Sequence, residues 1–201
     1  TGASRGIGLA CAERFKEEGA KVCTIQRSHS KLFDSYEFDL TREQDCLKSI
    51  EAIFNKYGCI DVLINNAGMM EEFSLQDTTL DSWNQTLSLN LTAPFLMSKF
   101  VMPHLINSKG CIVNIGSIEG IGANPKHAAY CASKAGLHGL TRAIAVDHGE
   151  DDIRCNAVAP GWIDTELNED FINSMPDPEH FRKNIGRIHP LNRTGKTKEI
   201  A

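Results

Sequence analysis

The sequence lacks the features that several classes of protein require. No apolar run approaches the roughly 20 residues that a membrane-spanning helix needs, so we expect no membrane partner. Lysine and arginine form no run and the net charge is −5, which argues against nucleic acid, because binding a phosphate backbone needs a clustered basic face. The seven cysteines form no Cys-x-x-Cys pair and are scattered as small core residues would be, which predicts a reducing, cytoplasmic environment.

One acidic stretch contains a histidine, but its spacing does not suit a metal site. It consists of Asp147, His148, Glu150, Asp151 and Asp152. We expect a solvated loop there and no bound metal.

The length and composition predict a single domain. The 201 residues, 41% of them hydrophobic, suffice for one core spanning 1–201. We expect the natural chain to continue at both ends. The glycine-rich turn at 1–8 should follow a buried strand, and we expect a further helix to begin near Glu199.

Strand and helix patterns alternate along the chain. Short apolar runs predict buried strands at 22–26, 61–64, 111–115 and 153–158. Helical spacing predicts helices at 8–18, 42–56, 80–107 and 126–148, the third bent by Pro94 and Pro103. This alternation predicts an α/β fold with a Rossmann-like, doubly wound parallel sheet. Residues 166–190 lack strand character and predict a small helical insertion, with a substrate lid over about 162–190.

The first eight residues, Thr1-Gly2-Ala3-Ser4-Arg5-Gly6-Ile7-Gly8, form a glycine-rich turn that opens a helix. A backbone that approaches phosphate oxygens and turns sharply into a helix has no room for a Cβ. The free N–H groups of the helix start would then face an anion such as a dinucleotide pyrophosphate. The alternative is a turn without a ligand, since short glycine motifs recur by chance.

Tyr130 and Lys134 lie four residues apart in a predicted helix, so they share one face. A phenol has an ordinary pKa of about 10 and is a poor base at neutral pH unless a cation stabilises the phenolate. Lys134 would be that cation, so the pair suits acid–base catalysis. Taken alone, the pair is also typical of an ordinary surface contact.

Six motifs follow one another in a particular order: the glycine turn, Asn65-Asn66-Ala67-Gly68, Asn90, Ser117, Tyr130-x-x-x-Lys134 and Pro160-Gly161. In these motifs and their spacing the chain resembles the classical short-chain dehydrogenase/reductase family over essentially its whole length. The resemblance implies a catalytic set of Asn90, Ser117, Tyr130 and Lys134. Ser117 would hold the substrate oxygen, Lys134 would also bind the nicotinamide ribose, and Asn90 would anchor a water of the proton relay. Singly, Asn90 is more typical of helix packing and Ser117 of a strand end.

The resemblance also implies where a nicotinamide dinucleotide binds. Asp39 would bind the adenine amino group, although an aspartate there also suits a cap at a strand end. Thr165 would bind the nicotinamide carboxamide, and Trp162 would join Ser117 and Tyr130 as a substrate contact. The implied cofactor residues are Gly2, Ser4, Arg5, Gly6, Ile7, Gly8, Arg27, Asp39, Leu40, Asn66, Ala67, Gly68, Tyr130, Lys134, Pro160, Gly161, Ile163 and Thr165.

The residue that ends the second strand bears on the choice of cofactor. An acidic residue there would favour NAD, but the position is Gln26. Arg27 follows it and Arg5 lies in the glycine turn, so two guanidinium groups would flank a 2′-phosphate and favour NADP(H) over NAD(H). The alternative is that both arginines only face solvent. Residues 27–38 barely fit a crossover helix, so we expect a short helix or a loop before Asp39 and Leu40, which would begin the next element.

We therefore expect an oxidoreductase that moves a hydride between NADP(H) and a small-molecule carbonyl or secondary alcohol, with Tyr130 as general acid/base. The alternatives are a nucleotide-sensing protein without catalysis, and an isomerase or dehydratase on the same scaffold. The family's long helices, here 80–107 and 126–148, would pack across a two-fold axis in a homodimer or homotetramer.

Overall fold

The computed structural model describes the backbone of residues 1–201 and every side chain except those of Asp170 and Ser174. The strands are β1 (Cys23–Gln26), β2 (Asp34–Glu37), β3 (Val62–Asn65), β4 (Cys111–Ile115), β5 (Arg154–Val158), β6 (Ile163–Asp164) and β7 (Gly195–Lys196). The α-helices are α1 (Gly6–Glu17), α2 (Glu43–Tyr57), α3 (Leu80–Leu87), α4 (Ala93–Ser108), α5 (Ala128–Asp147), α6 (Glu169–Ser174) and α7 (Pro178–Ile185).

The strands form three parallel groups, β1-β2, β3-β4-β5 and β6-β7. The first two residues of the chain lie between the first two groups. The Gly2 amide donates to the Ile25 carbonyl of β1 at 2.8 Å, and the Thr1 amino group donates to the Ile64 carbonyl of β3 at 2.8 Å. The predicted α/β fold with parallel strands is confirmed, and the glycine turn is tied to strands on both sides.

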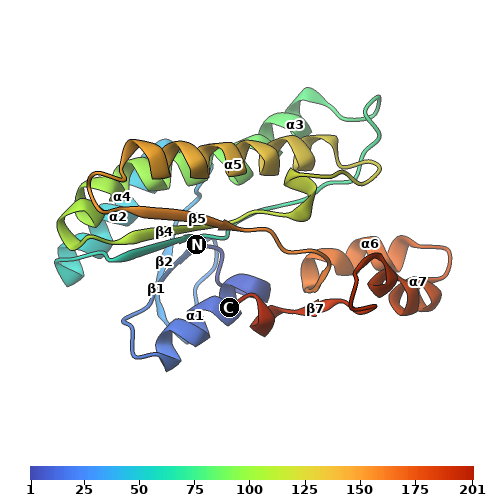
Figure 1. Cartoon of the computed structure of the whole chain (residues 1–201), viewed down its shortest axis with the longest axis horizontal. Helices are drawn as coiled ribbons and strands as arrows, with labels where there is room; N and C mark the ends of the chain where they lie inside the picture. Colours follow the sequence, from blue (N-terminus) through green and yellow to red (C-terminus); the bar gives the residue numbers. More distant parts are fainter.

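Helices lie on both faces of these strands. Figure 1 shows α2, α4 and α5 on one side of β4 and β5, and α1 on the other. The central side chains are fully buried in one hydrophobic cluster, in which Met97 and Leu105 of α4 join Ile112 of β4. This layering places the carboxyl ends of β3, β4 and β5, and the loops that follow them, at one edge.

The second strand group differs from the sequence prediction. The segment 27–33 is a loop, one of the two expected outcomes, but β2 was not predicted because its sequence Asp-Ser-Tyr-Glu has no apolar run. It forms because its backbone pairs with β1, from Cys23 opposite Asp34 to Gln26 opposite Glu37. Asp39 and Leu40 therefore follow a strand rather than begin an element, which corrects the prediction.

The predicted helix 80–107 is interrupted rather than continuous. Residues Ser88–Thr92 form a π-helical turn between α3 and α4. Pro94 lies in the first turn of α4, immediately after this π-helical turn, and Pro103 lies inside α4. The irregularity thus contains Asn90 and directly precedes Pro94, and single-turn π segments of this kind are frequent at functional sites.

The predicted helical insertion at 166–190 is confirmed. It contains α6 and α7, which extend beyond the end of the main sheet in Figure 1. Aromatic rings join it to the end of β5. Trp162 and Phe181 lie edge to face with centroids 5.6 Å apart, and Phe171 and Phe181 do so at 5.4 Å. Within the described part of the chain, the helices are too short or too polar to span a bilayer.

Candidate active site

The glycine turn leaves the N-terminus of α1 open toward the cavity. Gly2 and Gly6 have φ values of 64° and 61°, in the left-handed region that favours glycine. The first turn of α1 carries no acidic side chain, and Arg5 at its N-cap makes no side-chain cap bond. The N–H groups of that turn therefore face outward unneutralised, as a pyrophosphate requires.

The same turn is fixed against the loop that follows β3. The Asn66 side-chain amide donates to the carbonyls of Thr1 and Gly2, both at 3.0 Å. The Thr1 hydroxyl accepts from the amides of Asn66 and Ala67, also at 3.0 Å. A Cβ at Gly8 would stand 2.3 Å from the Asn66 amide nitrogen, so this close approach requires glycine. The Asn-Asn-Ala-Gly motif thus acts as a structural support as well as a part of the cavity wall.

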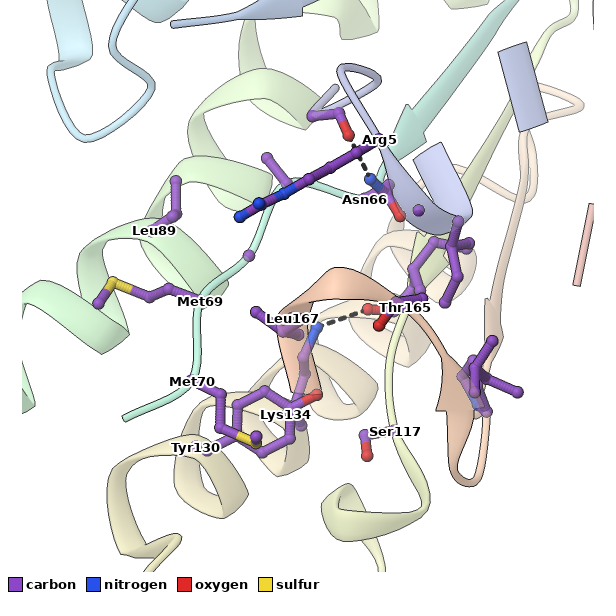
Figure 2. A pocket seen from close by; sticks show the side chains of 18 of the residues that line it. Arg5, Asn66, Met69, Met70, Leu89, Ser117, Tyr130, Lys134, Thr165 and Leu167 are labelled. Atoms are coloured by element: carbon purple, nitrogen blue, oxygen red, sulfur yellow. Dashed lines mark hydrogen bonds between the residues drawn. The ribbon is translucent and has the colours of Figure 1, made fainter. Parts of the chain in front are cut away.

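One cavity of about 1320 Å³ joins the predicted residues. Figure 2 shows Arg5 and Asn66 on one side of it and Ser117, Tyr130 and Lys134 on the other. Of the predicted site residues, Gly8 and Asn90 do not line it. Those that do are Gly2, Ser4, Arg5, Gly6, Ile7, Arg27, Asp39, Leu40, Asn66, Ala67, Gly68, Ser117, Tyr130, Lys134, Pro160, Gly161, Trp162, Ile163 and Thr165.

Tyr130 and Lys134 share one face of α5, as their spacing predicts. The Lys134 Nζ lies 5.6 Å from the centre of the Tyr130 ring and donates to the Ile115 carbonyl at 2.7 Å. Burial lowers the pKa of Lys134 to about 8. Burial also raises the pKa of Tyr130 to about 12, although the Ser117 hydroxyl opposes this rise. The expected lowering of the phenol pKa is therefore not seen, because burial is the largest effect and the bond to Ser117 does not offset it.

Ser117 begins the loop after β4. Its hydroxyl accepts from the Glu119 amide at 3.1 Å and caps a single 3₁₀ turn. Two further bonds connect this loop to the end of β5, from the Gly116 amide to the Val158 carbonyl at 2.7 Å and from the Ile118 amide to the Pro160 carbonyl at 3.0 Å. The serine is thus held at the edge of the sheet, on the side of the cavity that carries Tyr130.

Asn90 lies behind the cavity rather than in its wall. It is 1% exposed, and its side chain both accepts from the Met69 amide and donates to the Met69 carbonyl at 2.9 Å. It also donates to the Ser133 hydroxyl at 3.1 Å. Its side chain therefore links the loop after Gly68 to the helix of Tyr130.

The residues around the end of β1 differ in whether their side chains already have hydrogen-bond partners. The Asp39 carboxylate accepts from the Thr41 amide and hydroxyl, which together lower its pKa, so it does cap this turn. The Gln26 side-chain oxygen is buried without a partner. Arg5 and Arg27 are exposed, and the charge of Arg27 helps to lower the pKa of Asp39. Two exposed guanidinium groups thus line the cavity beside an unpaired amide oxygen.

Sequence reasoning missed several residues of the cavity wall. Met69 and Met70 follow the Asn-Asn-Ala-Gly motif, and Glu119, Asn124 and His127 lie between Ser117 and Tyr130. Glu119 and His127 are two residues after Ser117 and three before Tyr130, so their positions in the sequence were a usable signal. Within the described residues, no group of three or more His, Cys, Asp or Glu side chains is arranged to hold a metal.

The family model for short chain dehydrogenases matches residues 1–175. The chain belongs to the short-chain dehydrogenase family. Meso-2,3-butanediol dehydrogenase of Serratia marcescens is 34% identical to it over 100% of this chain and 82% of the relative. This short-chain dehydrogenase is thus an oxidoreductase, as its motifs predict.

Solved structures agree with this membership. The ligand-free aldohexose dehydrogenase of Thermoplasma acidophilum is 37% identical, with a TM-score of 0.93 over 99% of this chain and 81% of that one. ElxO with NADP bound is 31% identical, with a TM-score of 0.91 over 100% and 86%. Both support the Rossmann-type fold of this short-chain dehydrogenase, and the second shows that a similar structure holds NADP.

Proposed function

We propose that this short-chain dehydrogenase interconverts a small carbonyl compound and its secondary alcohol with NADP(H), and that Tyr130 donates or accepts the proton. The observation that carries the proposal is the continuous cavity. It runs from Arg5 and Arg27 to Ser117 and Tyr130, so one molecule bound along it would span an anion site and an acid–base pair.

The residues present fit a dinucleotide phosphate. The pyrophosphate would lie on the N-terminus of α1, against Gly2 and Gly6, where the backbone has room and no acidic side chain competes. A 2′-phosphate would lie between Arg5 and Arg27, whose guanidinium groups can each bind it through two N–H donors. Gln26 supports this preference, because it does not repel a phosphate as an acidic residue would.

When bound, the cofactor supplies or takes up the hydride. The Ser117 hydroxyl would hold the substrate oxygen, which orients the carbonyl group toward Tyr130. In reduction Tyr130 would give its phenolic proton to that oxygen, and its raised pKa keeps the phenol protonated beforehand. In oxidation it would accept the proton, with the Lys134 ammonium beside it favouring the phenolate. Asn90 would hold Met69 and the helix of Tyr130 in fixed positions relative to each other.

The substrate end of the cavity is bounded by the insertion. Trp162, Leu167 and Ile188 face Met70 and Ser117 around the same space. We propose that residues 162–190 act as a lid over a largely apolar substrate pocket, within one domain spanning 1–201. We also propose that α4 and α5 pair with a second copy in a homodimer or homotetramer.

The test measures the dissociation constants of NADPH and of NADH by nicotinamide fluorescence, for the wild type and for Arg27→Asp. We expect NADPH to bind at least roughly tenfold tighter than NADH, and Arg27→Asp to reverse the order, because a bidentate charge-assisted bond is lost and a repulsion gained. Lys31→Asp is the matched control. It makes the same charge change in the same loop, at a residue outside the cavity wall, and should leave the ratio within about twofold.

Two results would contradict the proposal. If neither nucleotide binds, the nucleotide-dependent reaction is wrong. If a substrate is converted without net change in nicotinamide absorbance, the protein acts as an isomerase or dehydratase instead.

A further inference from the structure

His127 lies where the loop between β3 and α3 meets the connection between β4 and α5. It is the N-cap of α5 and is 5% exposed. Its Nδ1 lies 2.8 Å from Oε2 of Glu119, which follows Ser117, and its Nε2 lies 3.6 Å from Oε1 of Glu72, which follows the Asn-Asn-Ala-Gly loop. A parallel bridge between Phe73 and His127 joins the same two segments through the backbone.

The two carboxylates indicate that the His127 ring carries a positive charge. Each ring nitrogen faces a carboxylate oxygen, and only the imidazolium form has an N–H donor on both nitrogens. The hydrogen bond to Glu119 raises the pKa of His127, against the effect of burial. Burial raises the pKa of Glu72 even though His127 opposes it. The placement of two carboxylates against one ring therefore favours an imidazolium, whose closest partner is the Glu119 carboxylate.

Glu119 is held in place by neighbours on every side. Its side chain is 11% exposed. Oε1 accepts from the Asn124 amide at 2.9 Å, and Oε2 accepts from the Cys131 thiol at 3.4 Å as well as facing His127. Burial would raise the pKa of Glu119, but the bonds to His127 and Asn124 lower it overall. A buried carboxylate of this kind depends on its cation, because an unpaired charge out of water is strongly unfavourable.

The pair of His127 and Glu119 lies beside the phenol of Tyr130. The His127 and Tyr130 rings are edge to face with centroids 6.2 Å apart. After burial, the Glu119 carboxylate is the larger of the charges that raise the pKa of Tyr130, with Cys131 next. The charged or titratable groups that face His127 are Glu72, Glu119 and Tyr130. Lys126 acts on Glu72, and the Cys131 thiol donates to Glu119.

We infer that His127 is a positioning residue: as an imidazolium it ties the loops of Ser117 and Glu72 to the start of α5 and cancels the Glu119 charge beside the Tyr130 phenol. The inference rests on the proposed role of Tyr130 in proton transfer. Without the imidazolium, Glu119 would act on the phenol unopposed and disfavour the phenolate.

The test follows the phenol directly. The chain has three tyrosines, so labelling them with ¹³C at Cζ gives three signals, of which Tyr130→Phe identifies one. The titration is followed with NADP⁺ bound, because the positive charge of the nicotinamide favours the phenolate and lowers the pKa of Tyr130 into a range where the protein is folded. In His127→Gln the Tyr130 signal should then titrate about 1 pH unit higher than in the wild type, the size expected for a nearby unscreened charge. The pH profile of kcat/KM for alcohol oxidation should move by the same amount.

A second variant separates charge from structure. In Glu119→Gln/His127→Gln both charges are removed, so the Tyr130 titration should return to within about 0.3 pH unit of the wild type. His148→Gln is the control, since it breaks a His–Asp pair of 2.9 Å at the other end of α5 and should shift nothing. Circular dichroism and the dissociation constant of NADPH verify that each variant is folded.

The inference is overturned if His127→Gln leaves the Tyr130 titration unchanged, or if the double variant shifts it as far as the single one. Failure of the proposed function would give a different result. Tyr130→Phe would then oxidise the alcohol at the wild-type rate, whatever the titration shows.

Discussion

The backbone amide of Trp162 donates a hydrogen bond to Nε2 of His189, 2.9 Å away. Trp162 follows Pro160-Gly161 after β5, whereas His189 lies at the end of the helical insertion. The bond therefore closes the base of the insertion. Gly161 allows it, because a Cβ there would stand 2.3 Å from Cε1 of the same ring.

Loss of this acceptor should weaken substrate binding. His189→Leu leaves the Trp162 amide without its partner, at a cost of about 1 kcal/mol, so KM for the substrate should rise about fivefold. His189→Gln keeps an acceptor near Nε2 and should have a smaller effect. Steady-state kinetics of both variants check this. Equal KM values for His189→Leu and the wild type would show that the bond between Trp162 and His189 does not contribute to substrate binding.

Removal of the phenol oxygen should abolish most of the turnover. In Tyr130→Phe we expect kcat to fall about 10²- to 10⁴-fold, because the proton donor is lost. The dissociation constant of NADPH should stay within about twofold, since the ring still packs in place. Single-turnover kinetics and nicotinamide fluorescence measure the two effects, and an unchanged kcat would remove Tyr130 from the mechanism.

Lys134 should lower the stability of the protein at neutral pH. Its pKa is about 8 in the folded state against 10.5 when free, so between these values the unfolded chain binds more protons. Stability should therefore rise as the pH goes from 8 to 10.5 and be lowest, by on the order of 3 kcal/mol, below pH 8. Lys134→Met should remove this dependence.

Urea unfolding at pH 7 and pH 10 measures that difference. The exposed Lys31→Met is the control and should follow the wild type at both pH values. The prediction is wrong if Lys134→Met is no more stable at pH 7 than the wild type once the lost bond to the Ile115 carbonyl, worth about 1 kcal/mol, is allowed for.

Two glycines should respond oppositely to alanine. Gly8→Ala places a Cβ 2.3 Å from both the Asn66 amide nitrogen and the Gly2 carbonyl, so we expect roughly 3 kcal/mol of destabilisation and loss of NADPH binding. Gly139→Ala, inside α5, meets only the end of the Arg142 side chain at 3.9 Å and should stabilise by about 1 kcal/mol. Thermal unfolding with and without NADPH compares them, and a stable, nucleotide-binding Gly8→Ala would contradict the packing described here.

Much of the site could be predicted because its signals are local. A glycine turn needs only adjacent residues to specify its backbone, and the spacing of Tyr130 and Lys134 places both on one helix face whatever surrounds them. Apolar runs likewise predicted β1, β3, β4 and β5 to within about two residues. In each case the physical cause lies within a few residues of the chain.

Other features depended on neighbours that only the tertiary structure supplies. The polar β2 forms because its backbone pairs with β1. Glu72, Glu119 and His127 meet because the loops that follow β3 and β4 begin at the same edge of the sheet. The direction of the Tyr130 pKa follows from burial, which its sequence neighbours do not determine. The sequence by itself determined the family and the residues that could do chemistry. Their charges and contacts were decided by folding, because desolvation and ion pairing depend on distances across the whole chain.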